Sequence, residues 1–430
     1  MVRIRSILVF FAVVVSIAHA DDSIEVEKWR EDADAYVAQL LSAHDDPFHT
    51  TNEAAFFIAL NEYKSSVEDM SYSERVVGLA RIAALVGDGH TWMPLYTVPF
   101  GSLPPGPNFR VLPVRFELFD DGLFVVGADA VHEGLLGKKV VRFDDVDADE
   151  ALARVLSILP LDAPQFSSEL APEWLMLHDI LRVFGMAGED NVVIGTAAGD
   201  KFPIQPLPGR AVMDWIFTND APPDGVTGWK TARQGRPPVF RQPRTSYWRM
   251  SEMDEVLYVQ LLEIRNEENQ TLREFGKSVA VRLSAMDRPK LVLDLRLTTG
   301  GDGLLNADFV AELAALKLAV EDFSVLIGRA THSAAIMLLS RLEQETQARF
   351  VGAPAGDRPN HHGETNIFVT PNSQLPIIYA SEYYQTSFAG DDRKFHAPAI
   401  RVQYNFEHYK KGEDPVLSTA LSHMNVSGEE

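Results

Sequence analysis

Residues 291–335 read LVLDLRLTTGGDGLLNADFVAELAALKLAVEDFSVLIGRATHSAA, and this stretch decides the fold. Its two short apolar runs, 291–295 and 323–327, predict buried strands. A glycine-rich turn and a helix from about Leu305 are expected between them, and a second helix is expected to begin near Ser333. Strands that alternate with helices predict an α/β domain with crossover connections and parallel strands.

The same alternation extends to both sides of this stretch. Residues 256–262 form another run typical of a buried strand, and Thr271-Leu272-Arg273-Glu274 is a capping box that predicts the start of an amphipathic helix. We therefore expect the α/β domain to cover residues 247–425.

The N-terminal half has two different patterns. Apolar residues at three- and four-residue steps predict helices over 24–86, and we expect a small helical cap over 21–95. Residues 111–126 alternate apolar and polar side chains, with Asp120-Asp121-Gly122 as a hairpin turn, and we expect a compact β-rich module over 105–215. A segment rich in Pro, Gly and Arg, 216–246, is expected to link this module to the α/β domain.

Charge and cysteine content exclude several classes of function. The formal net charge of −22 disfavours nucleic acid as a partner, because phosphates would be repelled. With no cysteine in 430 residues, disulfides, thiol nucleophiles and thiolate metal sites are excluded.

The first twenty residues are typical of an export signal. Arg3 and Arg5 precede an apolar run over 7–17, and Ala18-His19-Ala20 matches a signal-peptidase site. We expect a signal peptide over 1–20, a mature chain that begins at Asp21, no stable membrane anchor after cleavage, and a periplasmic or secreted location. The alternative is an uncleaved N-terminal anchor, for which the apolar run is short.

Three polar features could carry chemistry. Ser333 leaves a strand and opens a helix, where unpaired N–H groups can stabilise an oxyanion; the alternative is that this serine only caps the helix. The glycines that follow Asp294-Leu295-Arg296 can bring backbone N–H groups close to a ligand, although they match neither a P-loop nor a dinucleotide fingerprint. His90, in the loop Gly87-Asp88-Gly89-His90-Thr91, could take a proton from serine or could bond locally in its turn.

Together these motifs resemble peptidase family S41, which contains the tail-specific and C-terminal-processing proteases. The family's D-L-R-x-N-x-G-G strand end is matched at 294–301, its strand–serine–helix element at Ser333-Ala334-Ala335, and its G-D-G-H-T-like loop at 87–91. Its later proline- and glycine-rich stretch is matched over 351–363, and its terminal D-P-V-L pattern at Asp414-Pro415-Val416-Leu417. The resemblance covers residues 87 to 420, in the family's order.

The resemblance implies a fold and a reaction. The fold would be α/β, with a ClpP/crotonase-like catalytic domain, an N-terminal helical cap and a PDZ-like β-rich module. The substrate would be a peptide or protein, and no cofactor would be needed. Gly300 or Gly301, together with Ala334, would bind the oxyanion through backbone N–H groups.

The resemblance also implies how the serine is activated. The tail-specific branch uses a lysine about 25 residues after the serine, where this chain has Arg358, and no lysine lies between Lys317 and Lys394. Because arginine cannot lose its proton at working pH, the tricorn-like branch fits better. That branch implies His90 as the base, with activity rising near an imidazole pKa of about 6.5. Asp392, or alternatively Asp391, would orient the base, although these acids could also form a solvated turn with Arg393.

Two departures from the family's pattern leave a second function open. Ile336 stands where the family often has glutamate, and Thr298 stands where it has asparagine. These changes would suit an exported, non-catalytic protein that binds a peptide or an apolar ligand. The adjacent His361 and His362 lack the helical i,i+4 spacing of a zinc site, so no metal site is expected.

Overall fold

The computed structural model describes residues 25–97, 104–208, 222, 226–243, 246–253, 255–319 and 321–426. The signal peptide predicted over 1–20 lies outside these residues, and so do parts of the linker predicted over 216–246. Within the described residues, no helix is both long enough and apolar enough to cross a bilayer.

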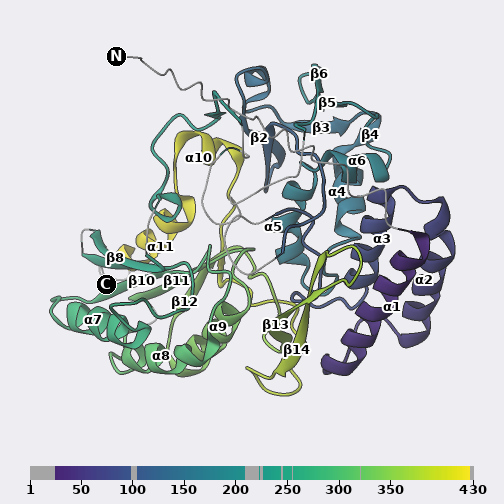
Figure 1. Ribbon diagram of the computed structural model, residues 1–430. Helices are drawn as coiled ribbons and strands as arrows, with labels where there is room; N and C mark the ends of the chain where they lie inside the picture. The colour runs from purple at the N-terminus through teal and green to yellow at the C-terminus, as the bar shows by residue number, and fades with distance from the viewer. Residues whose placement is uncertain are drawn as a thin grey trace, which may run out of the picture.

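The chain begins with three packed helices, which lie on the right in Figure 1. Their large apolar side chains, such as Trp29 and Tyr36, are fully buried. The third helix starts at the predicted capping box, where the side chain of Ser71 accepts the Glu74 N–H and the Glu74 carboxylate accepts the Ser71 N–H. The helices are α1 (Val26–Ala43), α2 (Glu53–Ser66) and α3 (Tyr72–Ala84).

Two small antiparallel sheets and three helices follow. The predicted hairpin at 120–122 joins β1 to β2. The three-stranded sheet has the order β1-β2-β7, from β1 (Val114–Phe119), β2 (Gly122–Ala128) and β7 (Lys230–Thr231). The four-stranded sheet has the order β4-β3-β5-β6, from β3 (Val140–Phe143), β4 (Val146–Asp147), β5 (Val192–Thr196) and β6 (Lys201–Ile204). The helices are α4 (Ala148–Leu156), α5 (Pro164–Trp174) and α6 (His178–Val183).

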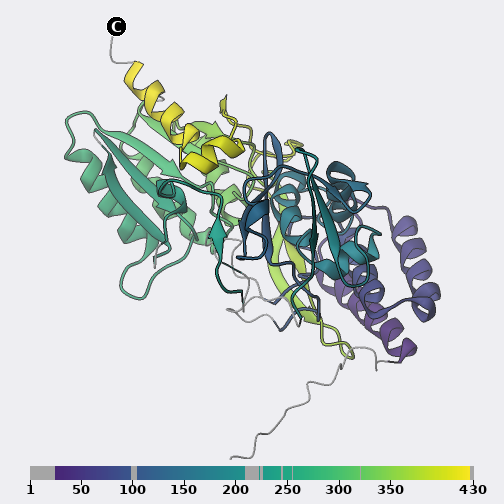
Figure 2. The same ribbon diagram turned by 90° about the horizontal axis from the view of Figure 1, so that it is seen from above.

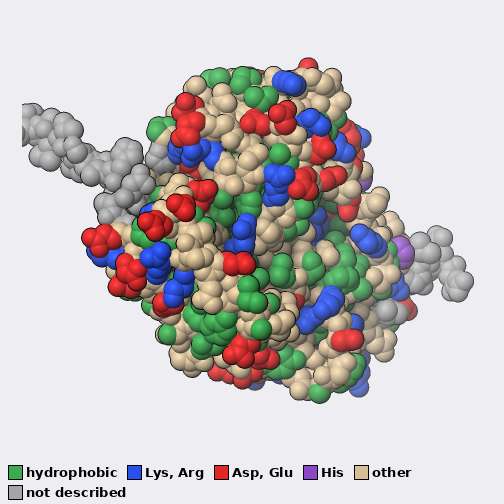
Figure 3. All heavy atoms as spheres, turned by 90° about the vertical axis from the view of Figure 1, so that its right-hand side faces the viewer, with side chains coloured by type: hydrophobic (Ala, Val, Ile, Leu, Met, Phe, Trp, Pro, Cys, Tyr) green, Lys and Arg blue, Asp and Glu red, His purple; other side chains and the backbone are tan. Residues whose placement is uncertain are grey.

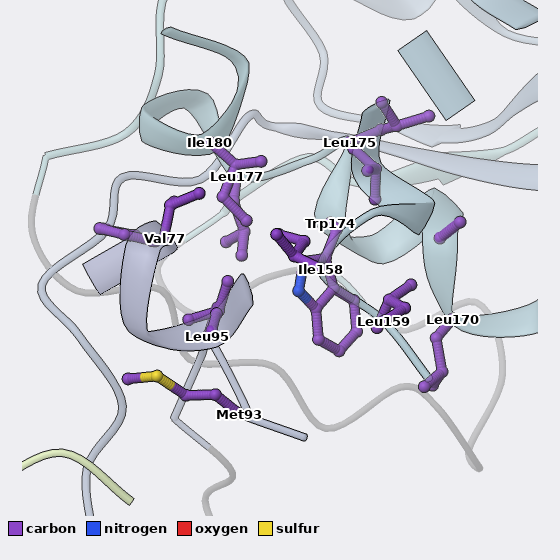
Figure 4. Close-up of a cluster of buried hydrophobic side chains, with 14 of the residues drawn as sticks. Val77, Met93, Leu95, Ile158, Leu159, Leu170, Trp174, Leu175, Leu177 and Ile180 are labelled. Carbon is purple, nitrogen blue, oxygen red and sulfur yellow. The ribbon is translucent and has the colours of Figure 1, made fainter. Parts of the chain in front are cut away.

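The helical cap and the β-rich segment share one hydrophobic core. Figure 4 shows Val77 of α3, Met93 and Leu95 in one cluster of buried side chains with Trp174 of α5 and Ile180 of α6. All five side chains are buried. The two N-terminal parts therefore pack as one lobe, and the PDZ-like character expected for 105–215 stays a prediction.

The C-terminal half is built on a six-stranded sheet of order β15-β12-β11-β10-β9-β8. All neighbouring pairs are parallel except β8 and β9. The strands are β8 (Trp248–Met253), β9 (Val256–Leu261), β10 (Lys290–Asp294), β11 (Phe323–Ile327), β12 (Arg349–Gly352) and β15 (Ile400–Arg401). From β9 to β12, successive parallel strands are joined by helices, which confirms the alternation predicted from residue 256 onward.

Helices cover both faces of this sheet. One face packs against α7 (Leu272–Ser284), α8 (Asn306–Ala314) and α9 (Ala334–Glu345), and the other packs against α11 (Pro415–Val426). A shorter helix, α10 (Phe406–Lys411), packs its Phe406 and Tyr409 on β1 and β2. Figure 2 shows α11 and the purple N-terminal helices at opposite ends of the molecule.

A long hairpin connects the two halves. It consists of β13 (His361–Val369) and β14 (Pro376–Tyr384), and it lies between the six-stranded sheet and α1 in Figure 1. Ile377 and Tyr379 of β14 belong to the core of the N-terminal lobe, and Gln39 of α1 donates a hydrogen bond to the Tyr379 hydroxyl (2.8 Å). The hairpin therefore fixes the N-terminal lobe against the residues that follow β12.

The surface on the side of the N-terminal helices carries mixed charge. In Figure 3, acidic and basic side chains are interspersed over this face, with apolar side chains between them. This arrangement is typical of a solvated protein surface.

Candidate active site

The predicted nucleophile and the glycine-rich loop meet at the carboxyl edge of the six-stranded sheet. Because β10 and β11 are adjacent and parallel, the loops that leave them start side by side. A Cβ atom on Gly300 would lie 3.0 Å from Cβ and 3.2 Å from Oγ of Ser333, so the two residues are in contact.

Ser333 has the backbone of a strained turn. Its φ of 55° and ψ of −126° lie in a region that residues with a side chain rarely adopt, and that costs on the order of 1–3 kcal/mol. Ser333 occupies the N-cap position of α9, yet its side chain makes no capping hydrogen bond. The serine therefore does not act as a helix cap in this structure, and its strained backbone is the kind of feature found at functional sites.

The residues predicted to bind an oxyanion surround this serine. Ala334 is the first residue of α9, where N–H groups have no partner within the helix. A Cβ on Gly300 would lie 3.9 Å from the Ala334 nitrogen, so both backbones approach the same point. Gly301 packs on the backbone of Ile264 and also lines the pocket described below.

The loop that carries His90 is held from two sides. The Asp88 carboxylate accepts the backbone N–H of His90 (2.9 Å) and contacts Nε2 of His44 at the end of α1 (3.0 Å). Thr91 accepts the N–H of Ala380 in β14 through its hydroxyl (3.0 Å). The glycine-flanked loop is thus fixed between the helical cap and the β13–β14 hairpin.

His90 is buried among other histidines. Its ring stacks on that of His332 at a centroid distance of 4.5 Å and on that of His361 at 5.7 Å. Neither of its ring nitrogens has a hydrogen-bond partner. Burial, aided by the charges of the neighbouring rings, lowers the pKa of His90 to about 3, so that the ring is neutral at physiological pH.

A pocket of about 790 Å³ joins these groups. Both lobes line it: Trp92 and Phe166 come from the N-terminal lobe, and Met337 comes from α9. Of the sequence-predicted site residues, those on its wall are His90, Gly300, Gly301, Ser333 and Ala334. The acids Asp302 and Glu364 also line the pocket, which gives it a mixed polar and apolar surface.

The predicted acid is not at the site. Asp392 is exposed, and the contact expected between its carboxylate and His90 is not formed, because both ring nitrogens of His90 lack a partner. The alternative, Asp391, is paired with Arg393 (2.7 Å), which in turn pairs with Glu343 (2.9 Å). Asp391 therefore belongs to a local ion-pair network with Arg393 and Glu343, and it does not form a triad with His90.

A different carboxylate lies beside the histidines. Asp357 is buried, and its Oδ2 lies 3.4 Å from Nε2 of His332. Burial raises the pKa of Asp357, but the contact with His332 and the nearby rings of His361 and His90 lower it further, so the group is ionised. Neither Asp357 nor the neighbours of His90 were predicted from the sequence.

Among the residues that the structure describes, two clusters of side chains have a geometry that could hold a metal ion. One consists of His90, His332 and Asp357, and the other of His44, His49 and Asp88. Since alternate residues of a strand face opposite ways, the adjacent His361 and His362 divide between the two. The ring of His361 stacks on His90, whereas that of His362 lies 4.3 Å from His49.

One further buried histidine, His396, is structural. His396 is fully buried, with Nε2 3.1 Å from the hydroxyl of Ser340 and its ring against Phe350. It does not line the pocket that contains Ser333. His396 is thus part of the packing behind α9.

Two of the sequence motifs turn out to hold the sheet together. Arg296, at the end of β10, binds the carboxylate of Asp294 and also that of Asp414 at the start of α11 (2.7 and 2.8 Å). All three side chains are buried. The D-L-R and D-P-V-L motifs therefore form one ion-pair cluster between the end of β10 and the start of α11. Thr298, which replaces asparagine, donates its hydroxyl to the carbonyl of Leu261 and accepts the His332 N–H at its own carbonyl (3.0 Å).

Comparison with known proteins gives a likeness in fold. No protein-family profile matches the chain, and no curated protein sequence matches it at a significant level. Mature CPAF is similar in structure, with a TM-score of 0.61 and 10% identity over 94% of this chain and 98% of that chain. Mature CPAF complexed with lactacystin gives a TM-score of 0.60 at the same identity and coverage. The tricorn protease is similar at a TM-score of 0.41 and 12% identity, over 94% of this chain and 37% of that chain.

The likeness to CPAF extends over nearly the whole of both chains. It shows that this chain has the same overall fold as CPAF. The mixed helix-and-sheet architecture expected from the sequence is confirmed in this form.

Proposed function

We propose that the protein is an exported serine-type peptidase of the S41-like kind, with Ser333 as nucleophile and His90 as general base. The observation that carries the proposal is the turn at Ser333. There, a strained serine without a capping bond touches Gly300 and shares one pocket with a neutral, unpartnered histidine. The fold shared with CPAF and the S41-like motifs support a peptide or protein as substrate.

In this mechanism, Oγ of Ser333 attacks the carbonyl carbon of a peptide bond while His90 takes the hydroxyl proton. The N–H groups of Gly300 and Ala334, with Gly301 beside them, bind the negative oxygen of the tetrahedral intermediate. His90 then gives the proton to the leaving amine, and an acyl group stays on the serine. Water, activated by the same histidine, releases the acyl group.

The carboxylate that acts on this histidine cluster is Asp357. Its negative charge stabilises positive charge on the neighbouring imidazoles, and it raises the pKa of His90 against the effect of burial. Because it contacts His332 and not His90, it acts as a positioning group for the cluster.

Labelling with a fluorophosphonate probe tests the proposal, because the probe reacts only with an activated serine. The mature chain should be labelled on Ser333, and labelling should be lost in Ser333→Ala. Ser340→Ala is a matched control, since this serine lies in the same helix, buried and bonded to His396. A native chain that folds but takes no label would overturn the enzyme and favour a binding protein of the same fold.

Peptide turnover tests the role of the base. His90→Ala should reduce the rate about as much as Ser333→Ala, because groups that act as one unit are not additive. If the His90 variant kept a near-normal rate, His332 or His361 would replace it as the base.

A further inference from the structure

Four buried polar atoms beside Ser333 have no hydrogen-bond partner. They are both ring nitrogens of His90, Nε2 of His332 and Oδ2 of Asp357. The three side chains are only 3%, 4% and 1% exposed, respectively. Buried polar groups in native proteins are nearly always paired, so four unpaired atoms at one point require an explanation.

The spacing of these atoms fits a metal ion better than a hydrogen bond. One ligand atom from each of the three residues lies within 4.8 Å of the others. The 3.4 Å between Nε2 of His332 and Oδ2 of Asp357 is long for a hydrogen bond. Ligands that bind a tetrahedral zinc ion at 2.0–2.2 Å lie about 3.3–3.6 Å apart, which matches this distance.

A further imidazole, that of His361, stacks on His90 beside the cluster, although it is not one of the three residues whose ligand atoms lie within 4.8 Å of one another. Nδ1 of His361 lies 3.1 Å from the carbonyl of Pro359 and 3.2 Å from that of Arg358, so this nitrogen carries the proton. Its Nε2 therefore keeps a free lone pair. A ligand histidine whose second nitrogen donates to a backbone carbonyl is the usual arrangement at zinc sites.

In the second histidine cluster, Nε2 of His49 is also buried and unpartnered, but the nitrogens of His44 are already engaged. Nε2 of His44 lies 3.0 Å from Asp88, which is an ordinary hydrogen bond, and its Nδ1 accepts the N–H of Asp46 (3.1 Å). Because Nδ1 accepts, the proton of this ring is on Nε2, and no lone pair is left there for a metal. The cluster at His90 is therefore the better metal site of the two.

We propose that His90, His332 and Asp357, joined by His361, bind a divalent transition-metal ion, with Zn²⁺ fitting best, and that the bound ion blocks the site. Histidine nitrogens and one carboxylate oxygen are the ligands that Zn²⁺ prefers when no cysteine is present. The ion takes the lone pair with which His90 would accept the serine proton. This inhibitory effect rests on the proposed function, whereas the binding itself does not.

Binding is tested without reference to activity by titrating Co²⁺ into the Ser333→Ala chain. Four-coordinate Co²⁺ bound by His and Asp should give intense visible absorption bands, and Zn²⁺ should displace it. Asp357→Asn and His361→Gln should each weaken binding at least about 10- to 100-fold. Circular dichroism verifies that each variant is folded. Because two variants are made, the prediction can still be tested if one of them misfolds.

His49→Ala is the matched control, because this partly buried histidine belongs to the other cluster. It should leave Co²⁺ affinity unchanged. If no tetrahedral bands form, if Asp357→Asn and His361→Gln bind as the parent chain does, or if His49→Ala abolishes the bands, the proposed site is wrong.

Inhibition is measured on the native chain with the fluorophosphonate probe. Zn²⁺ should slow labelling of Ser333, and a chelator should restore it. If Co²⁺ binds as predicted but labelling proceeds at the same rate with Zn²⁺ present, the inhibitory part is refuted. A chain that is never labelled, even with chelator, instead refutes the proposed function and leaves the metal site standing.

Discussion

His90 is buried between two other histidine rings, and this changes the pH range in which it can act as a base. Its pKa falls to about 3, first because of burial and then because of His332 and His361. A base whose pKa is lowered stays unprotonated in mild acid. An imidazole with an unperturbed pKa would make activity fall as the pH drops through about 6.5. That fall in activity should therefore be absent.

This is tested by the pH dependence of kcat/KM, which reports the free enzyme, measured with a chelator present. Activity should stay near its maximum from neutral pH down to about pH 5, well below an ordinary histidine pKa. An acid limb with its midpoint near 6.5 would show that a histidine with an unperturbed pKa is the base.

Gly300 should be intolerant of any side chain. Its φ is +145°, and a Cβ would press on Cβ and Oγ of Ser333 at 3.0 and 3.2 Å. Gly300→Ala should lower kcat by about 100- to 1000-fold, because it displaces the serine and one oxyanion donor together.

Gly199 provides a matched control for that substitution. It also has a positive φ, +89°, but no atom lies within 4 Å of the position of its Cβ. Gly199→Ala should impose a similar backbone strain but leave kcat unchanged. If both variants lost activity equally, strain and not contact with Ser333 would be the cause.

The junction of β10 and α11 depends on Arg296. This guanidinium binds Asp294 and Asp414 and lies 3.8 Å from the ring centroid of Phe240. Arg296→Met would leave two buried carboxylates without a cation, and it should lower the free energy of unfolding by about 3–5 kcal/mol. Urea unfolding followed by circular dichroism measures this.

Arg341 is the control for Arg296. It makes an exposed pair with Glu345 one helical turn away, and Arg341→Ala should cost no more than about 0.5 kcal/mol. Similar losses for both variants would mean that the buried cluster does not stabilise the junction.

Elements with local signals could be predicted from the sequence. The capping boxes at Ser71 and Thr271 begin α3 and α7, and the Asp120-Asp121-Gly122 turn joins β1 to β2. The parallel pairing of β10 with β11 followed from the helix between them. In each case, the deciding interactions join residues that are close in the chain.

The environment of His90 could not be predicted in this way. His90 comes from the N-terminal lobe, His332 from the loop after β11, and Asp357 and His361 from the segment that leads into β13, so residues far apart in the chain make up this environment. Asp392 failed as a candidate for a related reason. Its neighbour Asp391 finds a cation two residues away in Arg393, and the turn points Asp392 into solvent.

Acid should destabilise the whole molecule through its buried histidines. The pKa values of His90, His362 and His396 are lowered to about 3, 4 and 4, in each case first by burial. Unfolded, these side chains bind protons near pH 6.5. Between that value and about pH 4 the unfolded state binds more protons, so the free energy of unfolding should fall as the pH falls.

Urea midpoints measured between about pH 7 and pH 4.5 test this dependence. His396→Gln should flatten it, because one of the three titrating groups is removed. A midpoint that stayed constant, or rose, toward acid would contradict the assignment of neutral buried histidines.

The proposed base and nucleophile are supplied by different halves of the chain. At about 5–20 residues per second, a ribosome needs roughly 10–50 seconds to synthesise the roughly 240 residues between His90 and Ser333. The hairpin that fixes His90 against the serine is made later still. A nascent chain with the proposed site therefore cannot cut itself or its neighbours before this hairpin has been made. The proposed activity begins only when both lobes have folded together.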